Sequence, residues 1–221
     1  MHPIAHIRSP FASKFGIPRQ SNIIDDIPAT IVFTPEYRVP ESLRGIEEFD
    51  YLWLIWQFSE NVRSTWSPTV RPPRLGGNQR MGVFATRSSF RPNALALSSV
   101  RLLSVDLHTP DGPVLHIAGA DLMDGTPIFD IKPYIPYTDS HPDARSGFAP
   151  TPARRLLDVR CDSCWLMKME ESLRPSLIQL LAHDPRPQYQ NDPDRVYGLT
   201  FGGCDVRFRV DGDVLYVVEI V

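Results

Sequence analysis

The stretch RPPRLGGNQRMGVFATRSSFRPNALALSSVRLL runs from Arg71 to Leu103 and organises our prediction of the fold. In it, a short apolar run at Met81 to Phe84 alternates with turn-forming pairs such as Pro72-Pro73 and Pro92-Asn93. Proline, glycine and asparagine favour turns, each for its own conformational reason. The alternation therefore predicts loops whose positions are fixed by a short strand.

This stretch is also strongly basic. The sequence contains no acidic residue between Glu60 and Asp106, and all of its positive charges there come from arginine, at Arg63, Arg71, Arg74, Arg80, Arg87, Arg91 and Arg101. The planar guanidinium group suits bidentate binding of phosphate or carboxylate. A solvated basic face is the alternative, but we favour an anion site because the loops would present the arginines.

The composition limits the kind of protein. With 221 residues and 42% hydrophobic content the chain can bury a core, and its net charge of −3 argues that any nucleic acid is met locally. The sequence has no apolar run long enough to span a membrane, and its start lacks the pattern of a signal peptide. Three cysteines point to reduced thiols. We therefore expect a cytoplasmic protein.

The first 142 residues read as a β-domain. Short strands are expected at 4–8, 30–33, 49–58, 94–105 and 114–122, and a helical turn at 40–44. Turn signals occur at Pro110-Asp111-Gly112 and Asp124-Gly125, and Pro133 should place its strand at an edge or end it early. Many short strands with Gly and Pro turns predict a closed sheet or β-barrel.

The strand at 49–58 is the most apolar segment of the chain. Its sequence, FDYLWLIWQF, is too continuous to alternate, which predicts burial on both faces. We expect Trp53 and Leu54 in the core, whereas Phe58 could belong to the core or stack on a base.

Residues 143–221 are expected to form a second, smaller domain, whose first residues belong to a Pro-rich linker at 141–152. Apolar spacing predicts a helix at 170–182, followed by strands at 196–201, 204–210 and 214–221 with a hairpin turn at Asp211-Gly212. The whole chain is thus expected to be mainly β, or α+β when the smaller domain is included. Cys161-x-x-Cys164 lacks a second ligand pair at suitable spacing, so we expect no metal.

The chain also carries longer motifs. The strings KFGIPRQ, RPPRLGGNQRMGVFATRS, FRPN and DLMDGTPIFDIKPYIPY, with the later DPRPQYQ and VYGL, resemble the TsaA-like family, also called tRNA-methyltransferase O. The likeness covers nearly the whole chain. It implies a β-barrel enzyme that uses S-adenosylmethionine to methylate N6 of threonylcarbamoyladenosine at position 37 of tRNA. It also implies a homodimer.

The resemblance implies a cofactor site built from four parts of the chain. The positions that correspond are Pro18, Arg19, Gln20, Ser59, Glu60, Arg87, Leu97 and the run Asp121, Leu122, Met123 and Asp124. The loop at 9–20, with two prolines and a glycine, is one of these parts. Several positions depart from the family pattern, among them Ser59-Glu60, where a His-Gln pair is common.

Further residues are assigned to the RNA and to proton transfer. The anticodon stem-loop is expected to contact Lys14, Arg71, Arg74, Arg80, Arg91 and Arg186. A carboxylate near the acceptor nitrogen could take its proton, and the candidates are Asp121, Asp124 and Asp130. Turn formation for Asp124 and a solvated strand end for Asp130 are the alternatives.

Two other functions stay open at this point. The chain could transfer the methyl group to another acceptor, or it could be an RNA-binding β-barrel module without catalysis. An RNA-binding module would also display arginines and aromatic residues, but it would not bind S-adenosylmethionine.

Overall fold

The N-terminal part of the chain is a closed antiparallel barrel. A computed structural model describes residues 1–59, 65–149, 156–186 and 192–221. The barrel strands follow the order β1-β2-β7-β6-β3-β8, with β8 pairing back to β1. Their bounds are β1 Ala5–Arg8, β2 Pro28–Phe33, β3 Tyr51–Gln57, β6 Leu95–Thr109, β7 Gly112–Ala118 and β8 Pro127–Pro133. The predicted barrel is confirmed.

Alternating side chains fill the barrel. Ile7, Ile31, Leu52, Leu115 and Ile128 are almost fully buried and belong to one apolar cluster. Closing the sheet leaves no unpaired strand edge. β8 therefore pairs on both sides and is not an edge strand. It ends at Pro133, which agrees with the alternative prediction that this proline ends its strand early.

The prediction that β3 is buried on both faces was wrong. Leu52, Leu54 and Trp56 point into the barrel, whereas Trp53 and Ile55 are only half-buried on the outer face. A barrel strand has one core face, so its outer apolar residues need another partner. Trp53 packs against Tyr134, with ring centroids 5.5 Å apart.

Short turns connect β2 to β3 and follow β8. The 3-10 turns η1 Pro35–Tyr37, η2 Pro40–Leu43 and η3 Ile46–Glu48 lie between β2 and β3, and the short helix α1 Pro136–Asp139 follows β8. Asp139 fixes α1 to the barrel, because its carboxylate accepts hydrogen bonds from Trp53 Nε1 at 2.8 Å and from the amide of Ile135 at 2.9 Å.

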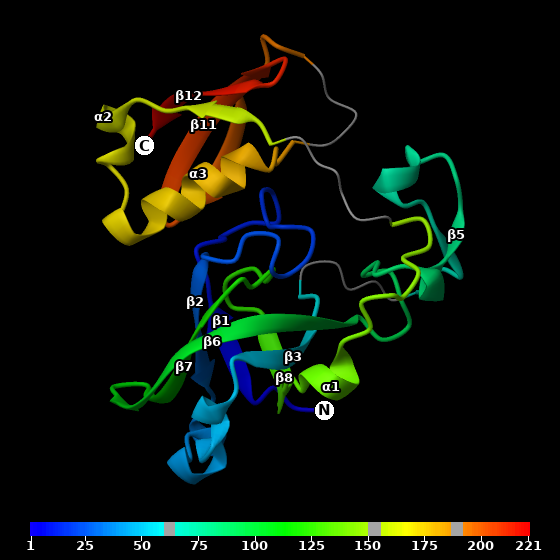
Figure 1. The fold of residues 1–221 in the computed structure, drawn as a ribbon, viewed down its shortest axis with the longest axis vertical. Coiled ribbons are helices and arrows are strands. Elements are labelled where there is room, and N and C mark those ends of the chain that lie inside the picture. The colour runs from blue at the N-terminus through cyan, green and yellow to red at the C-terminus, as the bar shows by residue number, and fades with distance from the viewer. Residues whose placement is uncertain (60–64, 150–155, 187–191) are drawn as a thin grey trace.

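Residues 65–94, which include most of the arginine-rich stretch, extend away from the barrel between β3 and β6 (Figure 1). We call this segment the excursion. Its strands β4 Thr69–Val70 and β5 Met81–Gly82 pair with each other, and the 3-10 turns η4 Pro73–Leu75 and η5 Val83–Ala85 lie beside them. The strand predicted to hold the arginines is thus two residues long, and Phe84 lies in a turn. Gly76 and Gly77, both with positive φ, close the hairpin.

The C-terminal part is a small α+β unit. Its sheet has the order β10-β11-β12-β9, in which only β9 runs parallel to its neighbour. The elements are β9 Asp158–Arg160, α2 Ser163–Leu166, η6 Glu171–Leu173, α3 Arg174–Ala182, β10 Tyr197–Phe201, β11 Cys204–Asp211 and β12 Val214–Ile220. The predicted helix and the Asp211-Gly212 hairpin are confirmed, whereas β9 and α2 were not predicted.

The two parts share a core. Figure 1 shows the C-terminal part beside the barrel end where the loop after β1 lies, with α3 between its sheet and that end. Phe11, Ile24 and Ile27 from that end belong to the same buried cluster as Leu177 and Phe208 of the C-terminal part. In the described ranges, no helix is both long and apolar enough to cross a membrane.

Candidate functional site

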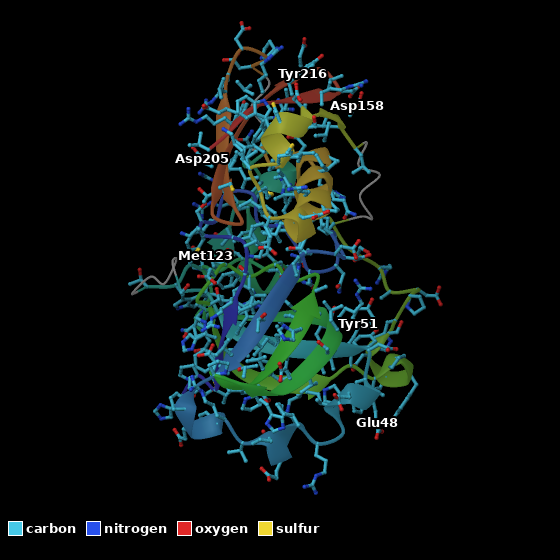
Figure 2. All side chains as sticks on the ribbon, turned by 90° about the vertical axis from the view of Figure 1, so that its left-hand side faces the viewer. Glu48, Tyr51, Met123, Asp158, Asp205 and Tyr216 are labelled. Carbon is cyan, nitrogen blue, oxygen red and sulfur yellow. The ribbon has the colours of Figure 1, made fainter. Side chains whose placement is uncertain are left out.

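A cavity of about 960 Å³ opens on the outside of the barrel. The loop after β1, the outer face and end of β3, the turn after β5, the start of β6 and the β7–β8 loop all line it. Met123, on the β7–β8 loop, lies near the level where the barrel meets the C-terminal part (Figure 2). The cavity thus gathers segments that are far apart in the sequence.

Most of the residues predicted to hold a cofactor line this cavity. They are Pro18, Arg19, Gln20, Ser59, Arg87, Leu97, Asp121 and Met123. Leu122 points the other way, into the barrel core, because neighbouring residues of an extended chain face opposite sides. Glu60 lies outside the described residues.

The loop at 9–20 is held by both parts of the chain. Its Phe11 ring is fully buried against Phe201 in an edge-to-face contact of 5.5 Å, and the amide of Gly202 donates to Pro10 O at 2.9 Å. Gly16 has a φ of +92°, and a Cβ there would lie 2.1 Å from Leu199 Cδ1. The C-terminal part therefore determines the position of the loop that carries Pro18, Arg19 and Gln20.

The polar centre of the cavity is a chain of hydrogen bonds that ends at Asp121. Trp56 Nε1 donates to Ser98 Oγ at 3.0 Å, and Ser98 Oγ donates to Asp121 Oδ1 at 2.6 Å. Ser98 is only 2% exposed. Because its Oγ accepts from Trp56, its own hydrogen points toward the Asp121 carboxylate. Asp121 is thus held in one orientation at the cavity wall.

Burial changes the acidity of Asp121. Loss of hydration raises the pKa of Asp121 above the ordinary aspartate value of 3.8, and the hydrogen bond from Ser98 and the attraction of Arg87 offset only part of this rise. A carboxylate with a raised pKa is a stronger base than an exposed one. The site can therefore accept a proton from a bound group.

Arg87 also lines the cavity. Its Nη1 donates to Gln20 Oε1, and Gln20 Nε2 donates to Arg19 O. Through these bonds the turn after β5 is tied to the loop at 9–20. The exposed guanidinium group places a positive charge where an anionic group of a ligand could bind.

The other two candidate carboxylates do not line the cavity. Asp124 accepts a hydrogen bond from the amide of Ser9 at 3.0 Å, so it holds the start of the loop at 9–20. Asp130 forms an ion pair with Lys132 at 2.9 Å and accepts from the amide of Ile131. Their positions agree with the turn and strand-end alternatives, and only Asp121 reaches the cavity.

The residues predicted to contact RNA divide into four groups. Lys14 and Arg91 line the cavity, and Arg71 and Arg80 are exposed on the excursion. The structure does not describe the side chain of Arg74. Arg186 is 8% exposed and its Nε pairs with Asp184 at 2.9 Å, so most of its side chain is covered, and its contact with RNA stays a prediction.

No metal site emerges from the described side chains. Cys161, Cys164 and Cys204 are free thiols, and no group of three or more His, Cys, Asp or Glu side chains in the described ranges is arranged to bind an ion.

Models of two domain families match the chain. The N-terminal domain of tRNA-methyltransferase O matches residues 6–140, and the C-terminal domain of the same family matches residues 157–221. The chain belongs to the tRNA-methyltransferase O family. The predicted resemblance is thereby confirmed over both parts of the structure.

Individual relatives agree with this family assignment. The chain is 40% identical over 215 residues to the tRNA (adenine(37)-N6)-methyltransferase of Escherichia coli K12, covering 94% of this chain and 91% of the relative. It is 44% identical over 173 residues to the enzyme of the same name from Eikenella corrodens, covering 78% of this chain and 97% of that one. A crystal structure of TrmO from Pseudomonas aeruginosa superposes with a TM-score of 0.78 at 33% identity, over 100% of this chain and 99% of the other.

Sequence reasoning missed several residues of this tRNA-methyltransferase O site. Trp53, Phe84, Thr86, Ser98 and Thr126 line the cavity but were not predicted there. Ser98 stands out in the sequence as a polar residue in a mostly apolar run. The sequence of that run does not show which residue the Ser98 side chain contacts. Trp56 pairs across the strands with Ala96, which makes Ser98 its diagonal neighbour.

Proposed function

We propose that the chain transfers a methyl group from S-adenosylmethionine to N6 of threonylcarbamoyladenosine at position 37 of tRNA. The names of its relatives support the reaction and the position. The observation that carries the proposal is the half-buried carboxylate of Asp121, the one carboxylate among the described residues of a large cavity that most of the predicted cofactor residues line.

The cavity fits this cofactor in size and in chemistry. Pockets for small molecules usually measure about 300–1,000 Å³, so a cavity of about 960 Å³ leaves room for a cofactor and part of a nucleotide. Ile55, Leu95 and Leu97 give an apolar wall for an adenosine, and Arg87 gives a partner for a carboxylate. When bound, S-adenosylmethionine supplies a methyl group on a positively charged sulfur.

Asp121 has a clear role in such a transfer. Replacing a hydrogen on N6 by a methyl group requires that one proton leave the nitrogen. Asp121 is the candidate carboxylate that lines the cavity, and its raised pKa makes it a suitable acceptor. Ser98 keeps the carboxylate pointing into the cavity, so we infer that Asp121 accepts this proton while Ser98 positions it. The substrate's own threonyl carboxylate or water is the alternative acceptor.

The remaining task of the protein is to position the two reactants. Holding reacting atoms about 3–3.5 Å apart can supply several kcal/mol of the barrier reduction. The hydrogen bonds that tie Arg87 to Gln20 and Ser9 to Asp124 give the cavity a fixed wall for this purpose.

The RNA is proposed to approach over the arginine-rich excursion. Arg71, Arg74, Arg80, Arg91 and Lys14 would meet the anticodon stem-loop, whose unpaired bases are accessible. A homodimer in the cytoplasm is part of the same proposal, and sedimentation of the purified protein tests the dimer.

Two measurements test the proposal. Calorimetric titration with S-adenosylmethionine should show binding, and incubation with methyl-labelled cofactor should label tRNA that carries threonylcarbamoyladenosine. Cofactor binding without RNA labelling would favour another acceptor. RNA binding without any cofactor binding would favour a non-catalytic module.

A further inference from the structure

Two aromatic rings lie open to solvent on the excursion. Trp66 is 51% exposed and Phe84 is 72% exposed, although large apolar side chains are usually buried. Their ring centroids are 6.2 Å apart and the rings are inclined by only 26°, so they form an open stack. Trp66 precedes β4 and Phe84 follows β5, which means that the β4–β5 pairing holds the stack together.

The two rings connect two cavities. Phe84 lines the 960 Å³ cavity, and Trp66 lines a second one of about 260 Å³. Arg91, Pro92, Asn93 and Leu95 line both, so the cavities adjoin along this segment. A nucleotide chain that places one base in the larger cavity therefore has the smaller cavity and the ring pair beside it.

The smaller cavity suits a flat heteroaromatic group. Phe90 and Phe129 contribute rings, and Gln57, Ser89 and Asn93 contribute amide and hydroxyl groups that can pair with the edge of a base. None of the described residues that line it carries a carboxylate, and Arg91 is fixed at its wall by a hydrogen bond from Nη1 to Thr86 O at 3.1 Å. Its volume lies below the usual range for a whole small-molecule ligand, so a single base is the better fit.

We propose that Trp66 and the 260 Å³ cavity hold the unpaired base next to the target adenosine of the anticodon loop. This inference rests on the proposed function. An adenosine can enter the larger cavity only if it leaves the stack of loop bases, and its neighbour then loses a stacking partner. Trp66 replaces that partner, because aromatic side chains stack on any base.

The test compares intact and abasic RNA. The probe is a threonylcarbamoyladenosine-containing anticodon stem-loop, prepared intact and with the base removed at either nucleotide adjacent to the target. With intact RNA, Trp66→Ala should weaken equilibrium binding by about 5- to 150-fold. With one of the two abasic RNAs, Trp66→Ala and the unsubstituted protein should bind equally, because the base that Trp66 contacts is gone.

Several controls separate stacking from other effects. Trp66→Phe keeps an aromatic face and should retain most of the affinity. Tyr137→Ala removes an exposed aromatic residue that lines neither cavity and should change nothing. The salt dependence of Trp66→Ala should equal that of the unsubstituted protein, because stacking releases no counterions. Unchanged melting temperature and unchanged affinity for S-adenosylmethionine would show that Trp66→Ala keeps the fold and the larger cavity.

The outcomes are distinct. Full affinity of Trp66→Ala for intact RNA, or the same loss on both abasic RNAs as on intact RNA, overturns the inference while the proposed function stands. If the unsubstituted protein neither binds nor methylates the stem-loop, the proposed function itself fails, and this inference with it.

Discussion

The hydroxyl group of Ser98 donates a hydrogen bond of 2.6 Å to the carboxylate of Asp121. Ser98 in turn accepts from the indole nitrogen of Trp56, so the direction of its hydrogen is fixed by a residue of another strand. The barrel thus orients a half-buried carboxylate at the wall of a cavity on its outer side.

Asp121→Asn is predicted to stop proton removal while keeping the shape of the site. An asparagine can still accept the Ser98 hydrogen bond through Oδ1 but cannot take a proton. Turnover should fall by about 10²- to 10⁴-fold, with binding of cofactor and RNA retained. Asp124→Asn and Asp130→Asn are matched controls that should keep turnover. Normal methylation by Asp121→Asn would assign the proton to water or to the substrate.

The same variant should be more stable at neutral pH. Because the folded pKa of Asp121 is raised, the folded state holds its proton up to a higher pH than the unfolded chain does. The contribution of Asp121 to folding stability is therefore fully present at pH values below its ordinary pKa of 3.8. This contribution is lost as the pH rises through the raised pKa of the folded state. The melting temperature of Asp121→Asn should exceed that of the unsubstituted protein at pH values above this window. A difference independent of pH would contradict the assignment.

Ser98→Ala is predicted to shift the pH dependence of methylation. Removing a hydrogen bond that lowers the pKa of Asp121 should raise this pKa further, so activity should begin to fall at a higher pH on the acid side. The variant also leaves Trp56 Nε1 buried without its partner, which costs about 1–3 kcal/mol in stability. Ser104→Ala, an exposed change on the same strand, serves as the control. A pH profile equal to that of the unsubstituted protein would show that Ser98 only supports the fold.

Arg87→Ala should weaken binding of S-adenosylmethionine. Hydrogen bonds to charged groups contribute about 1.5–3 kcal/mol, so calorimetry should show a loss of about 10- to 150-fold. The loss of the Arg87–Gln20 contact adds to this effect by freeing the loop at 9–20. Arg44→Ala changes an exposed arginine that does not line the cavity and should bind normally. Equal affinities for the two variants would remove Arg87 from the cofactor site.

Gly16→Ala tests whether the C-terminal part positions the cofactor loop. The added methyl group would overlap Leu199, and the positive φ adds strain. We expect lower cofactor affinity together with a lower melting temperature. Gly45→Ala has a similar φ of +85° but no atom within 4 Å, so it measures the strain alone. If both variants bind the cofactor equally well, contact with the C-terminal part does not set the loop.

Arg71→Ala and Arg80→Ala should differ in how they affect RNA binding. Each exposed arginine that neutralises one phosphate contributes about one unit to the slope of log affinity against log salt. Arg80 also donates to Thr69 Oγ1 at 2.8 Å, so its replacement should lower the melting temperature as well. A salt slope unchanged in both variants would place the RNA elsewhere.

The sequence predicted the β-barrel well because its signals are local. The turn residues at Pro110-Asp111-Gly112 and the strand-forming runs on either side of them, which became β6 and β7, require no knowledge of distant contacts. The burial of β3 was mispredicted for the opposite reason. Whether Trp53 faces a core or a cavity depends on what packs on the outside of the barrel, and Tyr134 and the cavity lie there.

The site could be predicted only where a motif marked it. Arg87, Gln20 and Asp121 stand in recognisable strings, and the structure brings them together. The roles of Ser98 and Gly16 depend on strand register and on the C-terminal part, which no local pattern reveals. Arg186 shows a further limit, because the sequence does not reveal that its side chain is mostly covered and pairs with Asp184.

Nucleoside analysis of methylated tRNA tests the central claim most directly. Purified protein, S-adenosylmethionine and tRNA carrying threonylcarbamoyladenosine are incubated, and the digested nucleosides are separated and identified by mass spectrometry. The account predicts one added methyl group, located on N6 of the threonylcarbamoyladenosine at position 37, and a product strongly reduced with Asp121→Asn. A methyl group at any other nucleoside, or none on the RNA, would contradict it.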